Sequence, residues 1–387
     1  MAADHVSVKV PNWLLSLVPV ALVGLLVVVI FAFNPIENLR DVPAVERVAF
    51  ERTTFEPGRI ELHLRNDGPD PVQIAQVLIN DAYWRFEASD ADLGRLETAT
   101  ITVAYPWEPG LPVKISLVTS TGVVIIHEIE AAALTPEFDV ETLGIYAVLG
   151  IYIGVVPVSI GLLWFSSLRR ASKKWLSFFL AFTVGLLAFL LVDTTGEGLE
   201  LAGEAAAALD GLALFAIGAL IAVICLMRLE NALEARKAGR EGLFLAYLIA
   251  AGIGLHNLGE GLAVGAALAA GEIALGTFLV LGFALHNTTE GLAIVAPLGR
   301  EGERPALSHF ALLGAIAGVP AITGAWAGGF IFNAAWAALA FGIAAGAIAQ
   351  VIWTISRSIR GGLVTAAGTG GFVAGLGFMY LTSLLTA

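Results

Sequence analysis

Long apolar segments separated by short loops fill the chain after Pro136 and constrain its fold more than any other feature. A helix needs about 20 mostly apolar residues to cross the roughly 30 Å hydrocarbon layer of a membrane. Only 14% of the 387 residues are charged and the mean hydropathy is +0.83, so much of the chain must contact lipid. The sequence therefore predicts a polytopic α-helical membrane protein. We expect eight core spans, at 141–168, 174–198, 210–230, 241–268, 272–297, 306–330, 334–356 and 362–386.

One more apolar run, Trp13 to Phe33, precedes these spans and is long enough to cross a membrane. A cleavable signal peptide is the alternative, but its apolar core would be about 7–15 residues long and would end at a small-residue cleavage site. Phe33-Asn34-Pro35 is not such a site. We therefore expect a cytoplasmic tail over 1–12 and a retained anchor helix over 13–33.

The segment 34–139 has a different character, with short β-branched or alternating stretches separated by turn signals such as Asn66-Asp67-Gly68-Pro69 and Thr121-Gly122. It predicts a small β-sandwich domain outside the membrane, followed by an eight-helix domain over 140–387. Its only histidines, His63 and His127, have no Cys or Met beside them, so we expect ordinary strand histidines and no blue-copper site. The expected strands are 59–65, 72–79, 99–103, 112–118 and 123–129.

Basic residues occur in alternate loops of the core and are absent from the loops between them. By the positive-inside rule the basic loops are cytoplasmic. We therefore expect the N-terminus inside and the β domain and C-terminus outside, in the cytoplasmic (inner) membrane of a prokaryote. The net charge of -12 argues against nucleic acid as a partner. The basic loop residues are Arg169, Arg170, Lys173, Lys174, Arg228, Arg236, Lys237, Arg240, Arg300, Arg304, Arg357 and Arg360.

The fourth and fifth core spans repeat one pattern, His-Asn-x-x-Glu-Gly-Leu-Ala. Residues four apart in a helix share a face, so each span presents an imidazole and a carboxylate together. Both histidines lie about 14 or 15 residues from the loop near Ala270-Gly271, or roughly 20 Å into the membrane. An ionisable group there costs about 2.5–3.5 kcal/mol to insert and is a functional candidate. The polar members of the repeat are His256, Asn257, Glu260, His286, Asn287 and Glu290.

Two half-sites at one depth suit a divalent metal, because imidazole and carboxylate ligands bind zinc, iron and manganese. The single cysteine, Cys225, lies in an apolar run and excludes an internal disulfide and CxxC chemistry. Packed core side chains that satisfy one another are the alternative, which the repetition at matched depth disfavours. The order of residues differs from metallopeptidase His-Glu-x-x-His and from Glu-x-x-His di-metal bundles, so we expect no enzyme.

Several polar residues flank the repeat. Asp193 and Glu197, one turn apart in the second core span, are predicted to attract a cation into a transport pathway, although a solvated acidic helix end is the alternative for Glu197. His309 marks a candidate exit or is a simple interfacial histidine. Gln350 is expected to hydrogen-bond a neighbouring helix, and glycines four residues apart are expected to let helices pack closely. Those pairs are Gly314/Gly318, Gly324/Gly328 and Gly371/Gly375.

The two motifs, Asp193 after Gly185-Leu186-Leu187 and the eight-span layout together resemble the ZIP (Zrt-/Irt-like) family of divalent metal transporters over 140–387. The resemblance implies a homodimer that moves zinc, with iron, manganese or cadmium as alternatives, inward by alternating access. It also implies that His256, Glu260, His286 and Glu290 are the principal ligands and that Asn257 and Asn287 face a second metal position.

The chain departs from the family pattern at Gly259 and Thr289, where many members have Pro. It also has Val319-Pro320 where many have Glu before Pro, and it lacks an acidic residue over 350–354, so one metal site is better supported than two. A second hypothesis is a membrane metal sensor or scaffold that does not transport and whose outer β domain binds a partner.

Overall fold

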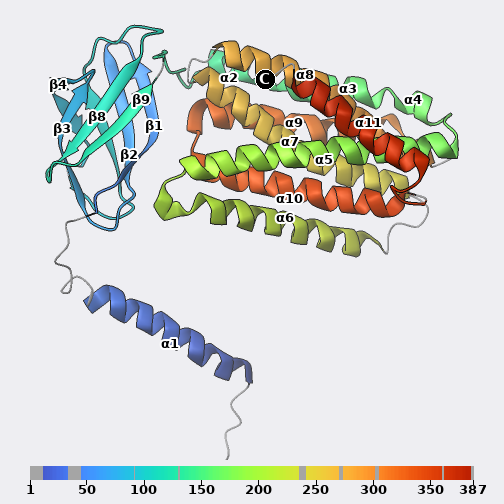
Figure 1. Cartoon of the computed structure of the whole chain (residues 1–387), viewed down its shortest axis with the longest axis horizontal. Helices are drawn as coiled ribbons and strands as arrows, with labels where there is room; N and C mark the ends of the chain where they lie inside the picture. Colours follow the sequence, from blue (N-terminus) through green and yellow to red (C-terminus); the bar gives the residue numbers. More distant parts are fainter. Residues whose placement is uncertain are drawn as a thin grey trace, which may run out of the picture. The chain divides into compact units, whose positions relative to one another are not determined.

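The computed structural model describes residues 12–33, 45–90, 92–129, 131–234, 241–269, 273–300, 305–359 and 361–384. The chain divides into two compact units, Met1–Val45 and Glu46–Ala387. The first contains α1 (Asn12–Phe33), a helix of 22 residues over the predicted anchor (Figure 1). Its placed apolar side chains, such as Leu22 and Val28, are exposed, as an anchor in lipid would require. Apart from Asn12, the predicted tail lies outside the described residues.

The second unit begins with a small antiparallel β domain of two sheets (Figure 1). Strand alternation places Ile60, Leu62 and Leu64 of β2 in a core that the two sheets share, which confirms the predicted β domain. The five predicted strands are all present, and β1, β4, β5 and β6 add to them. One sheet has the order β1 (Val48–Glu56), β2 (Arg59–Asn66), β7 (Thr98–Val103), β5 (Phe86–Ala88); the other has β4 (Ala82–Trp84), β3 (Val72–Ile79), β8 (Val113–Thr119), β9 (Val124–Ile129), with β6 (Asp92–Leu93) on β3.

Helices make up the rest of this unit. The first predicted span is interrupted, because a π-helical turn at Ile151–Val155 separates α2 (Val140–Gly150) from α3 (Val156–Leu162), and α4 (Phe165–Leu168) follows. Polar caps begin several helices: Asp139 Oδ1 accepts from Thr142 N at 2.7 Å. The remaining helices are α5 (Lys173–Glu204), α6 (Gly211–Glu234), α7 (Glu241–Ala269), α8 (Ile273–Val295), α9 (Leu307–Ile331), α10 (Ala334–Ser358) and α11 (Ala366–Ser383).

Within the described residues, seven helical segments are long and apolar enough to cross a membrane. The segment over Ala207–Asn231, which contains most of α6, has only 11% of its most apolar window buried, so most of its surface is available to lipid. The chain is therefore a multi-pass helical membrane protein. The eighth predicted core span falls on α11, which is helical but is not among the seven, so the full count stays a prediction.

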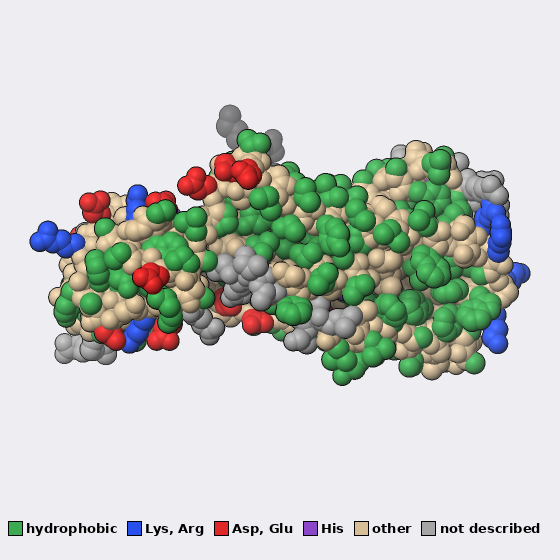
Figure 2. All heavy atoms as spheres, turned by 90° about the horizontal axis from the view of Figure 1, so that it is seen from above, with side chains coloured by type: hydrophobic (Ala, Val, Ile, Leu, Met, Phe, Trp, Pro, Cys, Tyr) green, Lys and Arg blue, Asp and Glu red, His purple; other side chains and the backbone are tan. Residues whose placement is uncertain are grey.

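Charge is distributed unevenly along the helical domain (Figure 2). On the face that is shown, its Lys and Arg side chains gather at one end, Asp and Glu side chains gather at the other, and apolar side chains cover the surface between. Helix α5 runs between these ends: Lys173 and Lys174 begin it, and Glu200 and Glu204 lie in its last turns. Such a polarised surface is what a protein with one basic and one acidic membrane face would present.

Glycines bring several helix pairs into backbone contact, among them α11 with α5 at Gly371 and Gly375. Gly324 and Gly328 of α9 pack against the carbonyls of Leu258 and Leu262 of α7, where a Cβ atom would collide with the backbone. This confirms the role predicted for this glycine pair. In the same way α3 and α8 meet at Gly161 and Gly291, whose Cα atoms face each other's backbone, and the two pairs, α7 with α9 and α3 with α8, frame the polar centre described next.

The β domain also contacts the helical domain directly. Asp67, in the predicted turn after β2, accepts hydrogen bonds from the backbone N–H groups of Ala207 and Ala208 at 2.9 and 2.6 Å. Those residues begin the short 3₁₀ helix Ala207–Leu209 that joins α5 to α6. Arg52 of β1 donates to the carbonyl of Phe330 near the C-terminal end of α9. The β domain thereby bonds to the connection between α5 and α6 and to the C-terminal end of α9.

Candidate functional site

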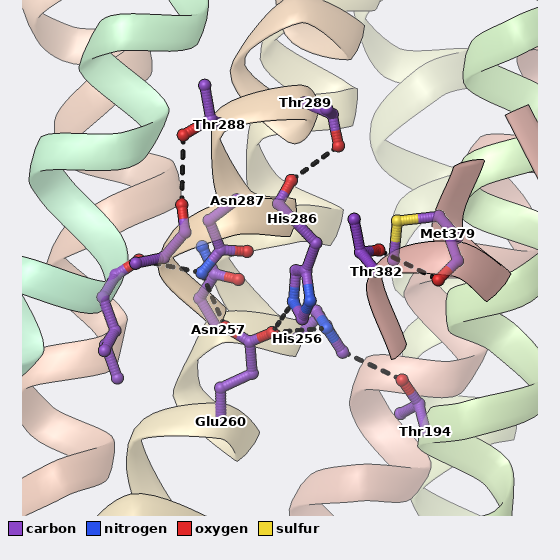
Figure 3. A network of polar contacts seen from close by, with 12 residues as sticks. Thr194, His256, Asn257, Glu260, His286, Asn287, Thr288, Thr289, Met379 and Thr382 are labelled. Carbon is purple, nitrogen blue, oxygen red and sulfur yellow. Dashed lines mark hydrogen bonds and ion pairs between the residues drawn. The ribbon is translucent and has the colours of Figure 1, made fainter. Parts of the chain in front are cut away.

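Helices α7 and α8 bring three ionisable side chains of the repeated motif together inside the helical domain (Figure 3). One ligand atom from each of His256, Glu260 and His286 lies within 4.8 Å of the others. All three side chains are buried, with exposed fractions of 3%, 3% and 8%. The predicted convergence of the two half-sites therefore holds for both histidines and for one of the two glutamates.

Glu260 is the centre of this cluster. Its Oε1 atom lies 3.1 Å from His256 Nε2 and also accepts from His286 Nε2. Its Oε2 atom accepts from Asn287 Nδ2 at 2.7 Å. A buried carboxylate is tolerated when it is paired and hydrogen-bonded in this way, and Glu260 joins α7 to α8 at the middle of both helices.

The two asparagines of the repeat are each held by a backbone carbonyl on a different helix. Asn257 Nδ2 donates to Ala317 O of α9 at 3.0 Å, and Asn287 Nδ2 donates to Ile153 O in the π-helical turn at 2.9 Å. Pro157 accounts for the free carbonyl of Ile153, because a proline has no N–H with which to bond the carbonyl four residues earlier. π-helical turns are frequent at functional sites, and this one supplies an acceptor to the centre.

Each asparagine oxygen is left without a donor by this arrangement. Among the described residues, buried side-chain atoms that lack a normal hydrogen bond include Asn257 Oδ1, Asn287 Oδ1 and both carboxylate oxygens of Glu290. Glu290 is 1% exposed and does not belong to the group within 4.8 Å. A buried acceptor without a donor is costly, so four such oxygens from one repeated motif call for a positively charged or hydrogen-bond-donating ligand.

A cavity of ≈ 570 Å³ is lined by Glu197, Glu200 and Glu204 of α5 together with apolar residues of α7, α8 and α10, and it is large enough to hold water and small ions. Its α7 lining residues include Leu262 and Ala266, which lie between Glu260 and the C-terminal end of that helix. Glu197 thus lines this acidic cavity, and its role in a pathway stays a prediction. Asp193 does not share this position, since it is on an exposed face of α5.

Thr194, next to Asp193, is the residue of α5 that contacts the centre. It is fully buried, and its Oγ1 atom lies 2.9 Å from His256 Nδ1 (Figure 3). Sequence analysis singled out Asp193 and missed Thr194, because a lone threonine in an apolar helix carries little signal. Ile153 was missed for the same reason, although Pro157, four residues later in an expected span, marks it as a carbonyl without its helical donor.

His309 and Gln350 lie away from this cluster. His309 Nδ1 is 2.8 Å from the hydroxyl of Tyr247, which precedes His256 by nine residues, or roughly 14 Å along α7. Gln350 Nε2 donates to Glu230 Oε2 of α6 at 3.2 Å, which confirms the predicted bond to a neighbouring helix. His309 is therefore separate from the metal-ligand candidates.

The two histidines of the β domain belong to different sheets. His63 Nδ1 lies 3.3 Å from Thr100 Oγ1 of the adjacent strand. His127 stacks on Phe50 with 4.5 Å between ring centroids, and burial lowers the pKa of its imidazole. Each one is accounted for by contacts within the β domain.

Comparisons with known proteins add little to this site. No family model matches the sequence, and no curated protein matches it. Among solved structures, the archaellum periplasmic stator protein FlaG from Sulfolobus acidocaldarius is similar at 11% identity, over 22% of this chain and 99% of that chain. The TM-score is 0.20, so this likeness carries no functional argument.

Proposed function

We propose that this protein binds a divalent metal cation between α7 and α8 and carries it across the membrane. The observation that carries the proposal is the set of buried, donor-free oxygens at Asn257, Asn287 and Glu290. The asparagine amides are turned so that their nitrogens face carbonyls, which leaves oxygens for the ligand. Acceptors without donors suit a cation and oppose an anion.

The ligand types favour a borderline divalent metal. His256, His286 and Glu260 supply imidazole nitrogen and carboxylate oxygen within 4.8 Å, a combination that suits Zn²⁺, with Fe²⁺, Mn²⁺ or Cd²⁺ as alternatives. The lone cysteine, Cys225, is exposed on α6 and contributes no thiolate to this centre. The motif resemblance to the ZIP family supports the same cargo and suggests a homodimer.

The resemblance to the ZIP family suggests inward transport, and charged residues mark the two ends of the pathway. Carboxylates at Glu197, Glu200 and Glu204 line a cavity on the side of Glu260 nearer the α7–α8 connection, where they would concentrate cations. The basic end of the helical domain would lie in the cytoplasm of a prokaryote by the positive-inside rule. Zn²⁺ would then pass from the acidic outer mouth, through the α7–α8 centre, to the inside.

Flux into liposomes tests the proposal. Protein reconstituted in vesicles that contain a zinc-sensitive dye should admit Zn²⁺, and the rate should fall at least tenfold in His256→Ala and Glu290→Gln. Thr183→Val is the matched control, because Thr183 is fully buried on α5 and donates only within its own helix, to Phe179 O at 3.0 Å.

The outcomes separate the two hypotheses for this chain. Zinc binding that depends on His256 and Glu290, without flux in the unmodified protein, would replace transport by the sensor or scaffold hypothesis. Absence of both binding and flux for Zn²⁺, Fe²⁺, Mn²⁺ and Cd²⁺ would refute the metal proposal as a whole.

A further inference from the structure

Thr194 uses its hydroxyl differently from the other two threonines of α5. Thr183 and Thr195 donate to carbonyls of their own helix, at 3.0 Å to Phe179 O and 2.6 Å to Leu191 O. Thr194 instead reaches a different helix, where its Oγ1 lies 2.9 Å from His256 Nδ1. The contact is fully buried, since Thr194 is 0% and His256 is 3% exposed.

The two nitrogens of His256 have separate partners. Nδ1 faces Thr194, and Nε2 faces the space shared with Glu260, 3.1 Å away, and with His286. The bond to Thr194 therefore restrains the ring at one nitrogen while the other faces the position where the ligand atoms converge.

We propose that Thr194 is a positioning residue for cation binding: its hydroxyl hydrogen-bonds His256 Nδ1 and so holds the imidazole ring with Nε2 toward the position of the cation. The proposal rests on the metal-binding function proposed above. Histidines that ligate metals commonly donate their other N–H to a protein acceptor, which fixes the tautomer and the ring orientation. Loss of such a partner costs roughly 10–100-fold in metal affinity.

The geometry also explains why α5 belongs to the centre although its carboxylates do not join the cluster. Asp193, adjacent to Thr194, is exposed, and Glu197, one turn later, lines the acidic cavity. The residue that α5 contributes to the cluster is thus a neutral hydroxyl that touches one ligand and adds no charge. Cation affinity would then be set by orientation of His256 as well as by the number of carboxylates.

Calorimetric titration of the purified full-length protein with Zn²⁺ tests this role. Thr194→Val, which keeps the side-chain shape but removes the hydroxyl, should weaken binding 10–100-fold. Thr194→Ser should restore most of the affinity, and Thr183→Val should bind as the unmodified protein does. Thr194→Ala serves as a second hydroxyl-free variant if Thr194→Val does not fold.

A double-mutant cycle distinguishes positioning from general support of the fold. In a His256→Ala background, Thr194→Val should have no further effect on the remaining Zn²⁺ affinity, because its only target is gone. Equal affinities for the Val, Ala and Ser variants and the unmodified protein would overturn the proposal, as would the same fold-loss with and without His256. If the unmodified protein binds none of the four metals, the proposed function itself fails.

Discussion

The same motif on α7 and α8 has two different environments. On α7, His256 has a partner at each nitrogen, and Glu260 is contacted by both imidazoles and by Asn287. On α8, His286 contacts Glu260, whereas Glu290 is buried with no normal hydrogen bond to any described residue. The same motif therefore provides one carboxylate, Glu260, that holds the two helices together and another, Glu290, that is available for a ligand.

This asymmetry follows from the neighbours of each helix and not from the motif. Glu260 lies between the two helices, so its oxygens meet donors from both. The half-sites can be tested against each other with matched substitutions, because each residue of one motif has a counterpart in the other.

Glu260→Gln should have the largest effect on the protein without metal. Removal of one partner from a buried, charge-assisted cluster costs about 3–5 kcal/mol of stability. We expect a marked drop in the melting temperature in detergent, together with loss of zinc binding. A variant as stable as Glu290→Gln would contradict the role of Glu260 as the link between α7 and α8.

Glu290→Gln should show the opposite pattern. The substitution removes a buried carboxylate that has no donor, so the metal-free protein should keep or gain stability. Zinc affinity should nevertheless fall by at least roughly 10–100-fold, which is the loss expected when a residue that only hydrogen-bonds a metal ligand is removed. Melting curves with and without Zn²⁺ measure both effects, and a metal-dependent shift as large as that of the unmodified protein would exclude Glu290 as a ligand.

Asn287→Ala should be more damaging than Asn257→Ala. Asn287 donates both to Ile153 O and to Glu260 Oε2, whereas Asn257 donates to Ala317 O. A buried acceptor left without its donor costs about 1–3 kcal/mol, and two are affected in the first case. Denaturation in mixed micelles should rank the two variants, and equal losses would show that the additional bond of Asn287 to Glu260 contributes little.

The smallest difference concerns the variable position before the glutamate, Gly259 on α7 and Thr289 on α8. A Cβ on Gly259 would lie 3.0 Å from the ring of Phe341, so Gly259→Ala should cost about 1–3 kcal/mol through overpacking. Thr289 bonds only its own helix, to His286 O at 2.6 Å, and Thr289→Ala should be nearly neutral. Thermal unfolding of both variants measures the two losses of stability. A larger loss for Thr289→Ala than for Gly259→Ala would place the tight contact on α8.

Much of the architecture could be predicted from the sequence. The apolar runs predicted the helices because lipid requires long uninterrupted segments, and the turn signals predicted five strands because the β domain follows ordinary alternation. The interruption of the first span at Ile151–Val155 was not predicted, although Pro157 lies just after it. Apolar composition is insensitive to such a turn, because it changes hydrogen bonding and not hydropathy.

The residues of the site that belong to the repeated motif could be predicted from the sequence, and those that occur only once could not. His256, Glu260 and His286 were expected to meet because helical spacing and depth are fixed by the backbone. The asymmetric partners of Glu260 and Glu290 were not, since they depend on how far each helix is rotated in the assembled domain. Thr194 and the carbonyl of Ile153 were not predicted for the same reason, because their importance comes from their partners on other helices, His256 and Asn287.

The glycine contacts have a mechanical consequence. Because α7 lies backbone to backbone with α9, and α3 with α8, each pair resists internal sliding. Gly150 and Gly154 bring the first span into the same kind of contact with α9, on either side of Ile153. The carbonyls that hold Asn257 and Asn287 therefore belong to tightly packed backbone. A movement of α8 relative to α7 would have to break the contacts of Glu260 with His286 and Asn287.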